Sequence, residues 1–144
     1  MAKDVYVCGV ELTMDILGGK WRIMILWYLR NKSLRFGQLK RSLKGISEKV
    51  LSEDLKQLTE LGLINKKVYY QKPLKVEYSL TDHGKSFLPI LYSIFEWGAD
   101  YAEVFNIPLI IDDATINKVL NEEERLLTEN QDSVNTNYIK INVR

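Results

Sequence analysis

The sequence has little of the residue types that metal sites, disulfide frameworks and acid–base catalysis use. Its 144 residues include one cysteine, Cys8, and one histidine, His83. A single cysteine excludes a disulfide within the chain, so any disulfide would join two chains or cap the thiol with a small molecule. Cys8 and His83 are the only reactive pair available, and His83 falls in a predicted helix cap. The sequence therefore predicts no enzyme, no metal site and no cofactor.

Long apolar runs are also missing. No apolar stretch approaches the roughly 20 residues of a membrane span, and the first residues lack the apolar core of a signal peptide. We therefore expect a cytoplasmic protein without a membrane partner. A chain of 144 residues, 46% of them hydrophobic, buries about two thirds of its unfolded surface and needs no disulfide or metal to fold.

Charge is balanced over the whole chain but not along it. The formal net charge is +1. Residues 1–80 carry 15 Lys and Arg against 8 Asp and Glu, a net +7, whereas residues 81–144 carry 5 against 11, a net −6. A basic half is either a solvated surface or the electrostatic footprint that nucleic-acid binding requires.

The clearest predicted element is a helix between Ser47 and Gly62. Ser47 is a good N-cap, Gly62 is a good stop, and no Pro or Gly lies between them. An apolar stripe follows spacings of four, three and three: Leu51, Leu55, Leu58 and Leu61. Residues 36–43 predict a second short amphipathic helix, with a tight connection over 44–46. Two short helices joined this way predict a helix-turn-helix; the alternative is an ordinary surface helix.

The pattern changes period after this helix. Residues 63–70 and 76–80 are β-branched and aromatic and flank a polar turn over 71–75. They predict a β-hairpin with Lys72 and Lys75 at its tip. A hairpin in this order predicts a mainly α fold with a small β-wing, a winged helix-turn-helix.

Helices are also predicted on both sides of this region. Residues 10–17 and 20–30 have helical patterns, and the second is apolar on nearly every side, which favours a central core position. Residues 81 to about 105 predict one long helix with a wide apolar face. Such a face favours a homodimer through the N-terminal and long C-terminal helices, alongside packing within the chain. The predicted dimer interface comprises Phe87, Leu91, Ile94, Phe95, Gly98, Tyr101 and Phe105.

We divide the chain at residue 107. Residues 1–107 are the expected DNA-binding domain with its dimerisation helices. Residues 108–144 are a C-terminal extension, with a helix expected over 114–127 and a disordered end as the default.

Cys8 lies just before the helix expected over 10–17, near its positive end. That location raises the reactivity of a thiol and suggests an oxidant or electrophile sensor. The alternative is a buried, inert cysteine that packs as a small hydrophobe.

A set of residues and short motifs in a fixed order runs from about residue 8 to residue 98. It comprises Cys8 with Glu11, Gly18-Gly19-Lys20-Trp21, Leu34-Arg35-Phe36 with Leu39, Gly45-Ile46-Ser47 with Lys49 and Leu51, Leu61-Gly62-Leu63, Pro73 with residues 76–81 and Gly84, and Trp97-Gly98. Together these positions resemble the HxlR-type family of bacterial transcription regulators, which is related to the MarR group. The resemblance implies a winged-helix homodimer that binds operator DNA, with repression favoured. It also implies that Cys8 stands where several members sense oxidants or small electrophiles.

Roles for individual residues follow from this interpretation. In this interpretation the helix between Ser47 and Gly62 is the recognition helix, and its N-terminal part enters the major groove. The candidates for base contacts are therefore Ser47, Lys49 and Ser52, with Lys56 further along. The candidates for phosphate contacts are Arg35, Lys40, Arg41, Lys72 and Lys75. Two alternatives remain open: a ligand-responsive regulator with a pocket formed by Trp21, Trp27, Phe95 and Trp97, and a winged-helix module that binds protein rather than DNA.

Overall fold

A computed structural model of the protein describes residues 4–110 and 121. The chain divides into two compact units, Met1–Leu88 and Pro89–Arg144. Asn121 is helical. The rest of the helix expected over 114–127, and the tail expected after it, lie outside the described residues.

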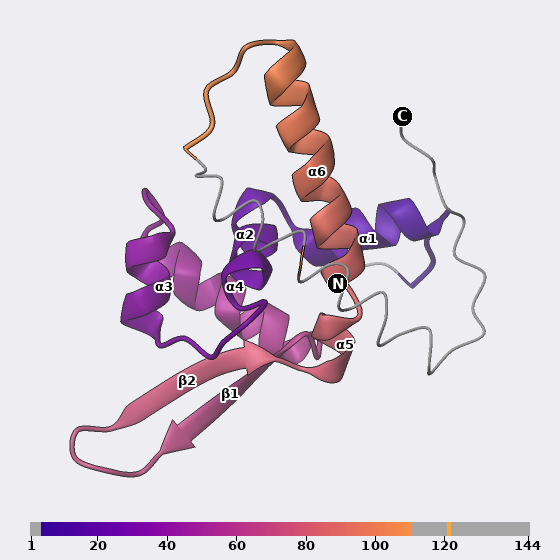
Figure 1. The fold of residues 1–144 in the computed structure, drawn as a ribbon. Coiled ribbons are helices and arrows are strands. Elements are labelled where there is room, and N and C mark those ends of the chain that lie inside the picture. Colours follow the sequence, from indigo (N-terminus) through magenta and orange to yellow (C-terminus); the bar gives the residue numbers. More distant parts are fainter. Residues whose placement is uncertain (1–3, 111–120, 122–144) are drawn as a thin grey trace. The chain divides into compact units, whose positions relative to one another are not determined.

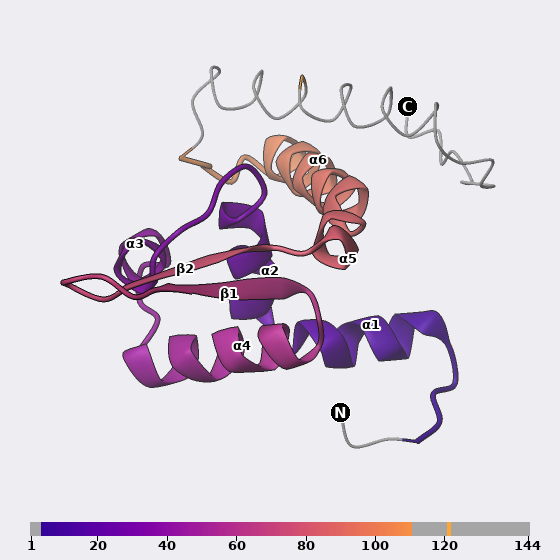
Figure 2. The same cartoon turned by 90° about the horizontal axis from the view of Figure 1, so that it is seen from below.

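The first unit contains helices and one hairpin (Figure 1). In chain order they are α1 (Gly9–Leu17), α2 (Lys20–Tyr28), α3 (Phe36–Ser42), α4 (Glu48–Glu60), β1 (Ile64–Tyr69), β2 (Lys75–Leu80) and α5 (Asp82–Lys85). The hairpin projects away from α2, α3 and α4, and β1 runs beside α4 (Figure 2). The predicted mainly helical winged fold is confirmed.

Local signals set the ends of α4. The Ser47 hydroxyl accepts a hydrogen bond from the Val50 N–H at 3.1 Å, as an N-cap does. Gly62 follows the helix with a φ of 73°, a left-handed conformation that glycine adopts without strain. Gly45, in the turn between α3 and α4, has a φ of 93°. The predicted helix-turn-helix geometry therefore rests on two glycines and one cap.

Leucine and isoleucine side chains from every helix before the hairpin form the core of this unit. The buried apolar residues are Leu17, Ile25, Leu26, Leu29, Leu34, Leu39, Leu43, Ile46, Leu51, Leu55, Leu58, Leu63, Ile64, Tyr78 and Leu80. Burial of one such side chain stabilises the fold by about 1.5–3 kcal/mol. Leu51, Leu55 and Leu58 of the predicted stripe therefore anchor α4, whereas Leu61 is its half-buried C-cap residue.

The hairpin is tied to the segment before α3 by a short bridge. Leu34 donates to the Tyr78 carbonyl at 2.9 Å and accepts from the Tyr78 N–H at 2.8 Å. β1 and β2 pair antiparallel, with Lys66 opposite Tyr78 and Lys67 opposite Glu77. This bridge fixes the position of the hairpin relative to the helix-turn-helix.

The helix predicted from residue 81 to about 105 is interrupted at Ser86 and Phe87, so the expectation of one continuous helix was wrong. Thr81 caps α5, accepting from the Gly84 N–H at 2.9 Å. A new helix, α6 (Leu88–Val104), follows. The physical reason is Pro89, which has no N–H for a bond to the preceding turn and is tolerated only near a helix start.

Arg22 of α2 joins three helices of the first unit. Its Nε lies 3.0 Å from Asp54 Oδ1 of α4, and its Nη1 donates to the Ile16 carbonyl of α1 at 3.0 Å. Both charged side chains are largely buried, at 18% and 15% exposure. The contact therefore holds α4 against α1 and α2 where solvent screening is weak.

Asp54→Asn should lower the free energy of unfolding by about 1–3 kcal/mol, because it leaves the Arg22 charge without its partner. Glu53→Gln, at the neighbouring exposed position, should change it by no more than about 0.5 kcal/mol. Urea denaturation measures both. Equal effects of the two substitutions would contradict a structural role for this ion pair.

Candidate nucleic-acid interface

The surface of α4 that faces away from the core has a regular charge pattern. Lys49, Glu53, Lys56 and Glu60 are all exposed, and their spacings of four, three and four place them in one row. Ser52 is exposed on the flank of α4 nearer the hairpin, where it lines a hollow with Lys66 of β1. A helix with short polar and cationic groups on its free face has the chemistry that base edges require.

The four residues predicted to contact bases all lie on or at the start of α4 and are exposed. Ser47 uses its hydroxyl oxygen in the cap, although its O–H can still donate. Lys49 lies in the first turn, where free N–H groups favour phosphate. Lys56 is 4.0 Å from Glu60 in an exposed pair, a contact of little energetic weight.

The residues of α3 that are predicted to contact phosphates lie at the two ends of that helix. Arg35 is the N-cap residue of α3 and is exposed, with its backbone N–H donating to Gln38 Oε1 at 2.8 Å. Lys40 and Arg41 lie in the last turn, Lys40 half-buried and Arg41 exposed. These three cationic side chains can therefore reach a phosphate while α3 stays folded.

The wing differs from expectation at Lys75. Lys72 is exposed in the turn, as predicted, but Lys75 belongs to β2 rather than to the tip. Its Nζ lies 2.9 Å from Glu77 Oε1 and 4.9 Å from the centre of the Tyr69 ring. The hydrogen bond from Lys75 lowers the pKa of Glu77 below its ordinary value. Lys75 therefore has an acidic partner within the wing, a feature that sequence spacing did not reveal.

Three charged residues of this surface were missed in the sequence. Glu53 is exposed in the middle of the α4 row, and Lys66 and Lys67 are exposed on β1. The alternation of side chains along a strand could have shown that Lys66 and Lys67 lie on opposite faces of the hairpin, since Lys66 shares a face with Ile64 and Val68. Glu53 could have been found from its spacing to Lys49 and Lys56.

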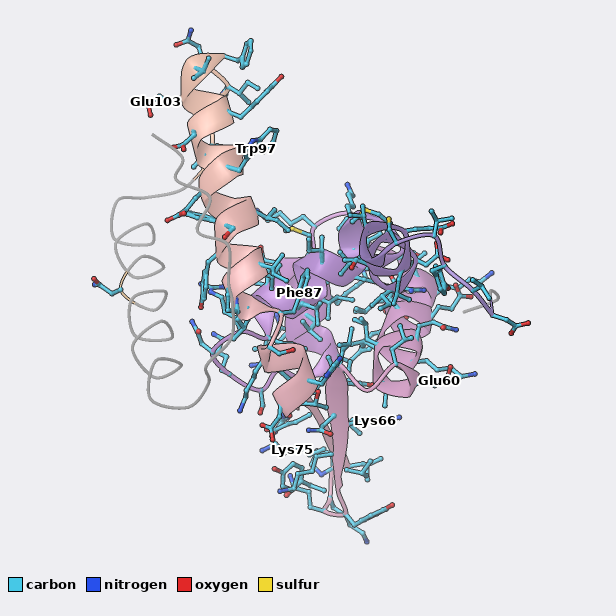
Figure 3. The ribbon with its side chains drawn as sticks, turned by 90° about the vertical axis from the view of Figure 1, so that its right-hand side faces the viewer. Glu60, Lys66, Lys75, Phe87, Trp97 and Glu103 are labelled. Atoms are coloured by element: carbon cyan, nitrogen blue, oxygen red, sulfur yellow. The ribbon has the colours of Figure 1, made fainter. Side chains whose placement is uncertain are left out.

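The described part of the second unit presents an apolar face on α6. Ile90, Ile94, Trp97, Tyr101 and Val104 are all exposed, Trp97 at 65%, and spacings of three and four place them on one side. The rings of Trp97 and Tyr101 stack at 5.2 Å, and Tyr101 lies 4.5 Å from Phe105. Figure 3 shows Trp97 and Glu103 on opposite sides of this helix.

The residues predicted for the dimer interface do not all lie on this apolar face. Ile94 and Tyr101 do, and Phe105 extends it just beyond the end of α6. Leu91 is buried within the single chain, Phe95 and Gly98 are partly exposed, and Phe87 lies in the turn before α6. Trp97 and Ile90 were not in the predicted set.

Cys8 is exposed and is the N-cap residue of α1, as expected from its position. Its side chain makes no cap hydrogen bond. The alternative of a buried thiol was therefore wrong, and the reactivity of Cys8 stays a prediction.

The described residues give no support to an aromatic ligand pocket. Trp97 is mostly exposed, while Lys20 lies 4.3 Å above the Trp21 ring and Arg30 lies 4.1 Å above the Trp27 ring. Within residues 4–110 and 121, no group of three or more His, Cys, Asp and Glu side chains could hold a metal ion. In the same part of the chain, no helix has the length and apolar character needed to span a membrane.

Comparison with known proteins identifies the same architecture. Residues 16–105 match the family model described as HxlR-like helix-turn-helix. The HTH-type transcriptional regulator YkvN of Bacillus subtilis is 43% identical over 98 residues, which cover 68% of this chain and 83% of YkvN.

Two solved structures are similar at the level of fold and sequence. A Porphyromonas gingivalis protein assigned to the MarR family of transcriptional regulators has a TM-score of 0.63 at 41% identity, covering 69% of this chain and 97% of its own. The redox regulator HypR in its reduced form has a TM-score of 0.65 at 34% identity, covering 69% of this chain and 98% of HypR. Both similarities exceed what fold alone would give, since sequence identity is high across nearly the whole of each relative.

Proposed function

Since this chain belongs to the HxlR-like helix-turn-helix family of transcriptional regulators, we propose that it is a sequence-specific repressor that binds operator DNA as a homodimer. The observation that carries the proposal is the exposed polar row of α4, held beside a wing with the exposed cation Lys72 in its turn. The basic first half of the chain supports it, because phosphate neutralisation supplies most non-specific affinity. A repressor of this kind acts in the cytoplasm and needs no enzymatic activity.

The residues divide into two roles in this proposal. Lys49 and Ser52, with Ser47 and Lys56 at either side, contact base edges in the major groove and set the preferred sequence. Arg35, Lys40 and Arg41 on α3 and Lys72 on the wing contact phosphates and supply affinity. Lys75 contributes less, because Glu77 already neutralises much of its charge.

Fluorescence anisotropy tests this function. The assay compares binding to duplex DNA from upstream of the gene and its divergent neighbour with binding to a random duplex, at two salt concentrations. We expect the native fragment to bind about 10³-fold more tightly or better, the ratio typical of specific regulators. Equal binding to both duplexes would contradict sequence recognition at that site. Absence of binding at low salt would favour the protein-interaction module.

Two substitutions in the same assay separate the roles. Lys72→Ala should weaken binding to both duplexes and reduce the salt slope by about one unit, whereas Lys49→Ala should change the preferred sequence. If both variants lost affinity equally on operator and random DNA, the division into base-contacting and phosphate-contacting residues would be wrong.

The exposed apolar face of α6 supports the dimer. Ile94, Trp97 and Tyr101 present a row of large side chains to solvent, which soluble monomers rarely leave uncovered. A two-fold dimer would place two recognition helices about 34 Å apart, in successive major grooves.

Trp97→Asp should convert the dimer to a monomer in sedimentation equilibrium, because a carboxylate would be desolvated in the interface. Glu103→Gln, on the opposite side of α6, also changes the charge by one unit and should leave the dimer intact (Figure 3). A Trp97→Asp protein that stays dimeric, with an unchanged circular dichroism spectrum, would place the interface elsewhere.

A second function is favoured by the exposure of Cys8, and HypR, a similar structure, is a redox regulator. We propose that Cys8 responds to oxidants or electrophiles. Diamide would take two hydrogens from the Cys8 thiols of two chains and leave one disulfide; a quinone would instead add the thiol across its ring and form one C–S bond. Either change would occur at the start of α1. The Ile16 carbonyl of α1 accepts a hydrogen bond from Arg22, which also bonds Asp54 of the recognition helix, so a shift of α1 can reach α4.

Cys8→Ser should bind the operator like the unmodified protein and lose any release by diamide or a quinone. The measurement is the same anisotropy assay with and without reagent, and the unmodified protein is the control. An unchanged response in the variant would refute thiol sensing and favour a ligand-responsive mechanism.

A further inference from the structure

A hollow of about 410 Å³ lies between the recognition helix and the first strand of the wing. Its lining residues are Ser52, Leu55, Lys56, Thr59, Glu60, Lys66 and Tyr78. Leu55 and Tyr78 are buried and form an apolar floor, whereas Ser52 and the charged residues are exposed at the rim. The hollow therefore opens to solvent with two ammonium groups and one carboxylate around it.

The strand register separates two neighbouring lysines of β1. Lys66 pairs with Tyr78 and lines the hollow, and Lys67 pairs with Glu77 on the other face of the hairpin. Figure 3 shows Lys66 on the side where Glu60 lies and Lys75 on the opposite side of the hairpin. Lys67 lies 4.8 Å from the centre of the Tyr69 ring. Within the described residues, the side chain of Lys66 makes no ion pair or hydrogen bond, so its charge is available.

The geometry of a duplex determines what must cross this hollow. A recognition helix lies in the major groove. In the proposed complex the hairpin beside it, with exposed Lys72 in its turn, reaches the neighbouring minor groove. One sugar–phosphate strand separates those two grooves. In the proposed complex that strand therefore passes between α4 and the hairpin, which lie side by side (Figure 2). The hollow is lined by residues of both elements.

We propose that this hollow receives the DNA strand that separates the two grooves, with Lys66 of β1 as a phosphate contact from the wing side. The inference rests on the proposed DNA binding and adds a contact to it. The apolar floor of Leu55 and Tyr78 suits the deoxyribose rings, which have little charge, while the ammonium groups at the rim suit the phosphates.

Glu60 gives the hollow a component that opposes binding. Its carboxylate lies 4.0 Å from Lys56 Nζ in an exposed, solvent-screened pair. With two ammonium groups and one carboxylate, the rim has a net charge of +1. A phosphate beside Lys66 would be repelled by Glu60, so Glu60 weakens the attraction of the hollow for any anion.

The test compares Lys66→Gln with Lys67→Gln by anisotropy over a range of salt concentrations, on the operator and on random duplex. Lys66→Gln should weaken binding to both duplexes about fivefold near 0.15 M salt and lower the salt slope by about 0.9, the effect of one lost phosphate contact. Lys67→Gln removes the same charge from the same strand on the other face, so it should have a clearly smaller effect. Glu60→Gln should tighten binding severalfold.

The outcomes separate this inference from the function on which it rests. Equal effects of Lys66→Gln and Lys67→Gln would mean that only overall charge matters, and would overturn the inference while leaving DNA binding in place. Unchanged affinity in Lys66→Gln would do the same. Failure of the unmodified protein to bind any duplex would overturn both. Matching thermal unfolding curves for the two lysine variants would establish that the comparison reports contacts rather than folding.

Discussion

The position of the recognition helix depends on the contact between Arg22 and Asp54. Leucine side chains on α4 supply most of its burial energy, but apolar contacts alone permit a helix to slide or rotate slightly. The 3.0 Å contact between Arg22 and Asp54 depends on the orientation of both side chains. The hydrogen bond from Arg22 to the Ile16 carbonyl holds the guanidinium group in place for it. The exposed row of α4 is therefore held in one orientation, as reading of base edges demands.

A second constraint fixes the wing. Leu34 and Tyr78 exchange two backbone hydrogen bonds, and Thr81 bonds the Gly62 and Leu63 carbonyls at 2.6 Å and 3.1 Å. These bonds join the end of α4, the start of β1 and the end of β2. Their effect is that the hairpin cannot move independently of the helix-turn-helix near its base, although its tip has no such tie. The hollow beside α4 is consequently a property of the fold rather than of a flexible loop.

Features determined by neighbouring residues were predictable from the sequence, and features determined by pairing across the fold were not. Ser47 and Gly62 bound α4 where expected, because caps and left-handed glycines act locally. The break before α6 is an exception. Its cause, Pro89, is local and visible in the sequence, but the apolar rhythm continues through the break and favoured one helix. The ion pair of Lys75 with Glu77 and the face of Lys66 depend on strand register, which composition does not give.

The charge pattern of α4 bears on how affinity and specificity divide. Its exposed row alternates Lys49, Glu53, Lys56 and Glu60, so the row carries no net charge. Such a row releases few counterions and adds little to non-specific binding, which depends on neutralised phosphates. Glu53 also accepts only from a donor such as the cytosine amino group, and it repels acceptor edges. In the proposed complex, affinity therefore comes from the cations around α4, and α4 itself acts mainly by rejecting wrong sequences.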